Sequence, residues 1–198
     1  MVLISRLTPE DAPLLADGFA RLSEESRRLR FLTPKPTLSR SELHYLTAVD
    51  GHRHEALGAI DPSTGRGVAV GRFIRDARDP ARAEVAITVS DEWQHRGLGK
   101  LLLIRLVDRA REEGIERFTA LVADDNESMH KLLERMDTPA HVTHVGDEVF
   151  EYEMRLAPKG LGPQLEAALR AAAAGNLKAP PRVCEALRAL VPLRLHRQ

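Results

Sequence analysis

The chain has 198 residues, a length that predicts one domain with an appended segment. Of these residues 43% are hydrophobic and 29% are charged, a balance typical of a soluble globular protein rather than a disordered one. Lys and Arg together number 29, as do Asp and Glu, so no basic excess indicates a nucleic acid or an anionic membrane as partner. A single cysteine excludes an intrachain disulfide, and no apolar run approaches the roughly 20 residues of a membrane helix. The first residues meet charge too early for a secretion signal, so we expect a cytoplasmic protein.

Alternating and helical apolar patterns predict an α/β (α+β layered) domain over residues 1–156. Thr8 followed by Pro9 predicts a helix start, and Gly114 predicts a helix end. In chain order we expect a strand (2–7), three helices (8–22, 23–31, 39–50), three strands (53–60, 67–76, 82–90), a helix (97–114), a strand (116–122), a helix (126–136) and two strands (141–145, 148–156). This order predicts a mixed sheet with helices packed on it.

Residues 157–198 differ from the rest in composition. They are rich in Ala, Leu and Pro, and carry seven Lys or Arg against two Asp or Glu. Two stretches with leucines at helical spacing flank the segment "GNLKAPPR". We expect a helical extension, packed on the domain or on a second subunit to form a homodimer. A disordered linker, a docking surface for an acidic partner and a nucleic-acid adaptor are the alternatives.

The stretch "DEWQHRGLGKLL", residues 91–102, places two glycines between a buried strand and a buried helix. Amides at a helix N-terminus favour an anion, and Gly97 and Gly99 would let a phosphate approach the backbone. Arg96 and Lys100 add positive charge. The P-loop spacing is absent, and a dinucleotide fingerprint needs a small residue where Leu102 stands. A purely structural glycine turn is the alternative.

The pattern Q-x-x-G-x-G at residues 94–99, with "ITVSDEW" before it and "DDNESMHKLLERM" later, resembles the acyl-CoA loop of the GNAT acetyltransferase superfamily. The stretch from "VGRFIRD" to "REEGI" resembles, more narrowly, bacterial Pat-type protein-lysine acetyltransferases. The resemblance covers residues 2–156 and implies a largely antiparallel central sheet with helices on both faces, and acetyl-CoA as co-substrate. The coenzyme contacts that it implies are Ile87, Val89, Gln94, His95, Arg96, Gly97, Leu98, Gly99, Lys100, Asn126 and Ser128. Asn126 can also be explained as an ordinary helix cap.

Glu84 is the candidate general base. It is the acid of strand 82–90, it faces away from Val85, Ile87 and Val89, and in the Pat-type resemblance it matches the catalytic glutamate. A lysine with a pKa of about 10.4 is only ~0.04% neutral at pH 7, an offset of roughly 4.6 kcal/mol that a base helps to meet. We expect partial burial to make this carboxylate a better proton acceptor. The alternatives are a solvated side chain and an ion pair with Arg72 or Arg82.

The general acid is less defined, because Leu133 stands where the family often has a tyrosine. Water, Ser128, Tyr45 or Tyr152 would then return the proton. Direct transfer is favoured over an acetyl-enzyme, since the cysteine lies in the extension and no G-x-S-x-G turn occurs. The histidine pairs at 52/54 and 141/144 lack the carboxylates or cysteines of a metal site, so we expect no metal.

The resulting hypothesis is an acetyl-CoA-dependent N-acetyltransferase that acts on a protein or peptide lysine, with an acyl-CoA synthetase as one possible partner. Acidic residues on the expected acceptor side favour a basic peptide, unless they are simply solvated: Glu24, Glu25, Glu42, Asp147, Glu148, Glu151 and Glu153. The alternatives are a small-molecule amine acetyltransferase and a non-catalytic acyl-CoA-binding sensor or assembly module.

Overall fold

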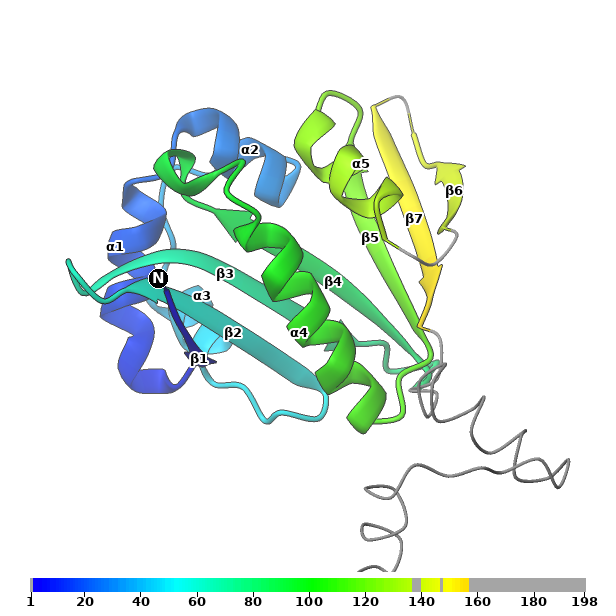
Figure 1. Cartoon of the computed structure of the whole chain (residues 1–198), viewed down its shortest axis with the longest axis horizontal. Helices are drawn as coiled ribbons and strands as arrows, with labels where there is room; N and C mark the ends of the chain where they lie inside the picture. Colours follow the sequence, from blue (N-terminus) through cyan, green and yellow to red (C-terminus); the bar gives the residue numbers. More distant parts are fainter. Residues whose placement is uncertain (1, 137–139, 147, 157–198) are drawn as a thin grey trace, which may run out of the picture. The chain divides into compact units, whose positions relative to one another are not determined.

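The computed structural model describes residues 2–136, 140–146 and 148–156 (Figure 1). The extension predicted over 157–198, with its suggested dimer contact, lies outside the described residues. The elements are β1 (Leu3–Arg6), α1 (Ala12–Ala20), α2 (Glu24–Phe31), α3 (Arg40–Thr47), β2 (His54–Asp61), β3 (Arg66–Arg75), β4 (Arg82–Val89), α4 (Leu98–Glu112), β5 (Arg117–Ala123), α5 (Glu127–Glu134), β6 (Ala140–His144) and β7 (Val149–Arg155). The predicted order of strands and helices is confirmed.

The described strands form one mixed sheet in the order β1-β2-β3-β4-β5-β7-β6. Every neighbouring pair in it is antiparallel except β4 and β5, which are parallel. These two strands pair only from Arg82 to Glu84, opposite Arg117 to Thr119, and diverge beyond that point (Figure 1). Residues 85–89 of β4 therefore have no strand partner on the β5 side, which opens the middle of the sheet.

Helices cover both faces of the sheet, as expected. α4 packs on β2, β3 and β4. Of its fully buried leucines, Leu103 and Leu106 join the main core, and Leu102 joins a second, smaller apolar cluster. Burying each such side chain is worth about 1.5–3 kcal/mol. α1 packs on the opposite face of β3, together with α3. The strand that ends at Val89 and the helix that begins at Leu98 are thus both held by the core, and the loop between them is fixed at its two ends.

Local signals set the helix ends. Ser23 and Ser39 cap α2 and α3 by accepting hydrogen bonds from Ser26 N and Glu42 N. The first helix begins later than predicted: Thr8 is followed by a 3₁₀ turn over Pro9–Asp11, and α1 starts at Ala12. The Asp11 carboxylate accepts a hydrogen bond from Thr8 N at 2.8 Å, which stabilises that tight turn. No helix in the described ranges is both long and apolar enough to cross a membrane.

Candidate active site

A cleft of about 610 Å³ lies where β4 and β5 diverge, within the size range of small-molecule sites. Its walls come from the end of β4, the loop that follows, the first turn of α4, α2 and α5. The predicted coenzyme residues that line it are Ile87, Val89, Gln94, His95, Gly97, Leu98, Gly99, Lys100, Asn126 and Ser128. The fold therefore brings all but one of these residues, drawn from two separate stretches of sequence, to a single cleft.

The exception is Arg96. Its guanidinium lies 5.1 Å from the centre of the Trp93 ring, and the residue is not among those that line the cleft. Positive charge reaches the cleft instead from Lys100, from Arg30 on α2, and from Lys131 on α5 and Arg135 at its C-cap. Arg30, Lys131 and Arg135 were not predicted from the sequence, although the i,i+4 spacing of the last two places them on one helix face.

The loop before α4 presents uncapped amides to the cleft. Gly97 is the N-cap residue of α4, at φ 80°, and no side chain caps the helix there. His95 also has a positive φ, 59°, so two residues of this short loop adopt left-handed conformations. The free N–H groups and the helix dipole together favour an anion at this end of α4.

The two glycines of the loop serve different purposes. A side chain at Gly97 would meet nothing within 4 Å, so glycine is needed there for its positive φ. At Gly99 a Cβ would lie 3.6 Å from Leu132 and 3.8 Å from Val89. The missing side chain of Gly99 therefore leaves space between β4 and α5, whereas Gly97 shapes the backbone.

A hydrogen-bonded network ties α2 to the end of β4. The Asp91 carboxylate accepts bonds from Ser23 N (3.0 Å), Ser23 Oγ (2.7 Å) and Ser26 Oγ (2.8 Å). Burial opposes ionisation of Asp91, but these hydrogen bonds outweigh it and lower its pKa. Gln94 Nε2 donates to Ser26 Oγ at 3.2 Å and to Val89 O at 3.3 Å. Gln94 thus fixes the position of one wall of the cleft.

An ion pair joins the two walls of the cleft. Arg28 on α2 donates to Asp125, in the loop before α5, at 2.5 Å, and also pairs with Glu25 at 2.6 Å. Asn126, the next residue, accepts a hydrogen bond from Met129 N at 3.1 Å through Oδ1. Asn126 is therefore a helix cap, and the cap leaves its side-chain amide nitrogen uncommitted.

Glu84 is the last residue of β4 that pairs with β5, at the point where these two strands begin to separate. Its side chain is exposed, so the expected partial burial is wrong. It is not paired with either arginine weighed from the sequence, because Arg72 bonds elsewhere and Arg82 lies 3.4 Å from Asp76. Within the described ranges Glu84 forms no hydrogen bond or ion pair through its carboxylate, which leaves it available to a substrate.

The candidate general acids differ in their access to the cleft. Leu133 is 1% exposed and belongs to the core, so no polar group replaces the usual tyrosine at that place. Tyr152 is buried, which raises its pKa, and its hydroxyl lies 2.6 Å from Nδ1 of His130. Tyr45 is exposed and lies against the ring of His54. Of these side chains and Ser128, only Ser128 lines the cleft.

Comparison with known proteins identifies the family. Residues 19–137 match the Acetyltransferase (GNAT) family. The chain is 36% identical over 129 residues to the acetyltransferase Pat of Mycolicibacterium smegmatis, covering 65% of this chain but only 38% of that protein. The GNAT domain of S. lividans PAT has a similar structure, with a TM-score of 0.71, 32% identity, and coverage of 77% of this chain and 89% of that one.

A more distant structure has the same fold. A putative acetyltransferase from Salmonella typhimurium, solved with its cofactor acetyl-CoA, gives a TM-score of 0.62 at 16% identity, over 82% of this chain and 97% of that one.

Proposed function

The chain belongs to the GNAT family of acetyltransferases, and from that premise we propose that it transfers an acetyl group directly from acetyl-CoA to a protein lysine, with Glu84 as general base. The observation that carries the proposal is the cleft itself: β4 and β5 separate just beyond Glu84, and the uncapped start of α4 closes the other end. The resemblance to Pat-type enzymes supports lysine as the acceptor.

The residues around the cleft fit coenzyme A. Its pyrophosphate would be held by the amides at the start of α4, with Lys100 close by. The unpaired edge of β4, residues 85–89, offers backbone hydrogen bonds to an extended chain such as the pantetheine arm. The space that Gly99 leaves between β4 and α5 accommodates that arm. Acetyl-CoA supplies the acetyl group as a reactive thioester.

Glu84 does not itself line the cleft, but it lies three residues before the cleft residue Ile87 on β4, and we place the arriving amine there. Its carboxylate accepts the proton that the amine loses as the new C–N bond forms and the C–S bond breaks. The departing thiolate, with an ordinary thiol pKa of about 8.5, takes its proton from water or from Ser128. Backbone N–H groups near Ile87 stabilise the charge that develops on the carbonyl oxygen.

The deciding experiment incubates the purified chain and acetyl-CoA with lysine peptides, an acyl-CoA synthetase and small amines, and follows acetylation by mass spectrometry. We expect a lysine product whose formation depends on Glu84. Transfer only to small amines would show that the acceptor is a small molecule rather than a protein. Tight acetyl-CoA binding without transfer to any acceptor would contradict the proposal and support a sensor.

A further inference from the structure

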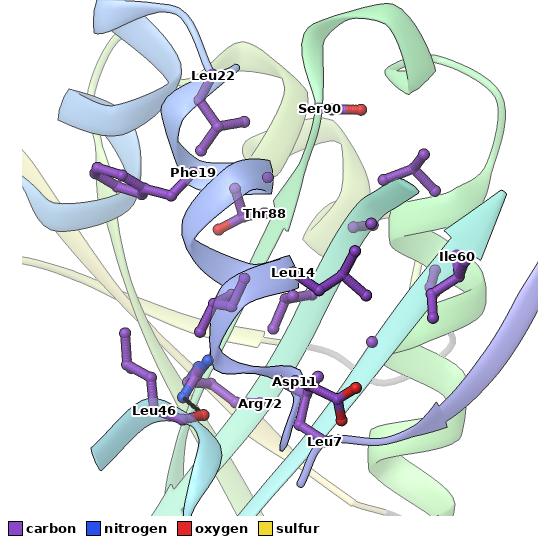
Figure 2. Close-up of a pocket in the computed structure, with 18 of the residues that line it drawn as sticks. Leu7, Asp11, Leu14, Phe19, Leu22, Leu46, Ile60, Arg72, Thr88 and Ser90 are labelled. Carbon is purple, nitrogen blue, oxygen red and sulfur yellow. Dashed lines mark hydrogen bonds between the residues drawn. The ribbon is translucent and has the colours of Figure 1, made fainter. Parts of the chain in front are cut away.

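A buried arginine without a carboxylate partner lies next to the candidate active site. Arg72, on β3, is 4% exposed. Its Nη1 donates to Leu46 O at 3.1 Å (Figure 2) and to Nε2 of His54 at 3.1 Å, and both acceptors are neutral. No ion pair involves Arg72 in the described part of the chain. A guanidinium has five N–H donors, so most of its hydrogen-bonding capacity is not used by these two contacts.

A second arginine reinforces this positive charge. Arg30 of α2 is partly buried, and its guanidinium lies 4.9 Å from the centre of the Phe31 ring. Burial and the nearby charge of Arg30 together lower the pKa of Arg72 to about 9. Burial also lowers the pKa of Arg30, and the negative charge of Glu84 opposes that shift. The two cations therefore lie close together. The carboxylate of Glu84 is near enough to influence the pKa of Arg30, but it forms no ion pair with either arginine.

Both arginines line an apolar crevice of about 90 Å³. Figure 2 shows this crevice between α1 and the sheet, with Arg72 among its labelled residues. Its other walls are mostly apolar side chains, including Leu14, Phe19 and Leu22 of α1 and its flank. Arg30 and Thr88 line both this crevice and the coenzyme cleft, so the two spaces share a boundary. The crevice has room for a small group and not for a second cofactor.

The strand register places Arg72 close to the reaction centre. Arg72 lies directly opposite Ala86, so Glu84 and Thr88 are its diagonal neighbours on the same face of the sheet. Diagonal neighbours in an antiparallel pair lie about 7–8 Å apart. A group bound at Arg72 would therefore be within one side-chain length of an amine at Glu84.

Unpaired buried charge is costly, and proteins usually remove it or pair it. Its presence beside a candidate active site is a recognised sign of a functional role. We propose that Arg72, with Arg30 at the boundary of the cleft, binds a carboxylate carried by the acceptor and so positions the acceptor amine at Glu84. This inference deepens the proposed function: the acceptor is an amine with a nearby carboxylate, from an acidic residue beside a lysine or from a small amino acid.

The first test measures carboxylate binding without any chemistry. Thermal unfolding is followed with propionate and with its neutral isostere propionamide, at matched ionic strength and without acetyl-CoA. We expect propionate alone to raise the melting temperature of the wild type, and Arg72→Met to lose that shift. Arg66→Met, an exposed position on the same strand, is the matched control and should keep it. Arg30→Met should weaken the shift and replaces Arg72→Met if that variant fails to fold.

An equal response of the wild type to propionate and propionamide would overturn the proposal. So would a propionate shift that survives in both Arg72→Met and Arg30→Met. Neither result depends on acetyl transfer, so this binding test remains decisive even if the chain does not acetylate lysine.

The second test compares acceptors that differ only in one carboxylate. One pair is a lysine peptide with Asp or with Asn next to the lysine, and the other is a small amino acid and its amide. A charge-assisted contact of about 1.5–3 kcal/mol corresponds to a KM lower by roughly 10- to 100-fold for the acidic member. In Arg72→Met the ratio should fall to about one.

The acceptor pair whose two members differ in KM identifies the source of the carboxylate. Discrimination only between the peptides assigns it to an acidic residue of a protein, and discrimination only between the small molecules assigns it to a free amino acid. A ratio near one for both pairs in the wild type would contradict the proposal.

Discussion

Buried charged side chains occur on both faces of the β2–β3 pair, but their hydrogen-bond partners differ between the two faces. On the face that α4 covers, the fully buried Glu55 accepts hydrogen bonds from Arg6 at 2.8 and 2.6 Å and from Arg109 at 3.0 Å. On the opposite face, Arg72 bonds only to neutral acceptors among the described residues. We call the first group the paired cluster and the second, with Arg30 and Glu84, the unpaired cluster.

The difference separates a structural role from a functional one. In the paired cluster the carboxylate satisfies two guanidiniums, and its hydrogen bonds raise the pKa of both Arg6 and Arg109. These contacts join β1, β2 and α4, so the cluster holds secondary-structure elements together. In the unpaired cluster no carboxylate of the described residues pairs with Arg72 or Arg30, which leaves the arginines and Glu84 available to groups from a substrate. The two roles predict opposite responses to mutation.

The largest effect is expected from Glu84→Gln, in the unpaired cluster. Losing a general base typically costs 10²–10⁴-fold in turnover, so kcat at pH 7 should fall by about that factor. Stability should change by less than about 0.5 kcal/mol, because the side chain is exposed and unbonded within the described structure. Steady-state kinetics and urea unfolding of the same preparation measure both quantities, and unchanged turnover would remove Glu84 from the mechanism.

Glu55→Gln, in the paired cluster, should do the reverse. Removing the charge leaves Arg6 and Arg109 without their shared carboxylate, and breaking a buried ion pair costs about 3–5 kcal/mol. Both arginines are partly exposed, which favours the lower end of that range. Glu112→Gln is the matched control, since it removes an exposed partner of Arg109 and should cost at most about 1 kcal/mol. Denaturant unfolding gives the free energies; turnover below the melting temperature should persist.

The contrast also explains what the sequence predicted. Periodicity and local capping depend on residues a few positions apart, so the order of elements, the helix starts expected at residues 23 and 39 and the helix end at Gly114 all agree with expectation. The cleft likewise follows from one continuous motif and one helix start. The fold class and most of the residues that line the cleft could therefore be predicted from the sequence.

Features that depend on distant contacts were not accessible. Glu55 meets Arg6 across 49 positions and Arg109 across 54, and no local pattern marks such a triad. Arg30 and Arg72 come together only because α2 folds back over β4. The exposure of Glu84 and the stacking of Arg96 on Trp93 also depend on neighbours that the sequence does not reveal.

A smaller effect should appear in the pH dependence of stability, through His54, whose Nε2 accepts a hydrogen bond from Arg72 of the unpaired cluster. Burial, and then the charge of Arg72, lower the pKa of His54 to about 4, against about 6.5 in an unfolded chain. Between these values the unfolded chain binds a proton that the folded chain does not. Stability is thus highest above pH 6.5 and falls as the pH drops toward 4, by at most about 3 kcal/mol.

Urea unfolding at several pH values measures this effect as the slope of the free energy of unfolding against pH. His54→Gln should flatten it between pH 6.5 and 4, whereas His44→Gln, at an exposed position, should not. The same slope in wild type and His54→Gln would show that another group is responsible. Propionate bound at Arg72 should also flatten it, since an added negative charge raises the pKa of His54.

The smallest effects are expected at the glycines of the loop, where no charge is involved, and they should differ in sign. Gly97→Ala forces a side chain into a left-handed conformation, at a cost of about 1–2 kcal/mol in stability. Gly99→Ala lies in the first turn of α4, where a Cβ makes ordinary contacts, and should be neutral or stabilising by up to about 1 kcal/mol.

Acetyl-CoA affinity and fold stability should not change together in these glycine variants. The new methyl group of Gly99→Ala occupies space between β4 and α5, so calorimetry should show weaker acetyl-CoA binding although the fold is at least as stable. If Gly99→Ala binds acetyl-CoA as tightly as the wild type, the pantetheine arm does not pass through that space. The role assigned to the cleft would then rest on the uncapped amides of α4 alone.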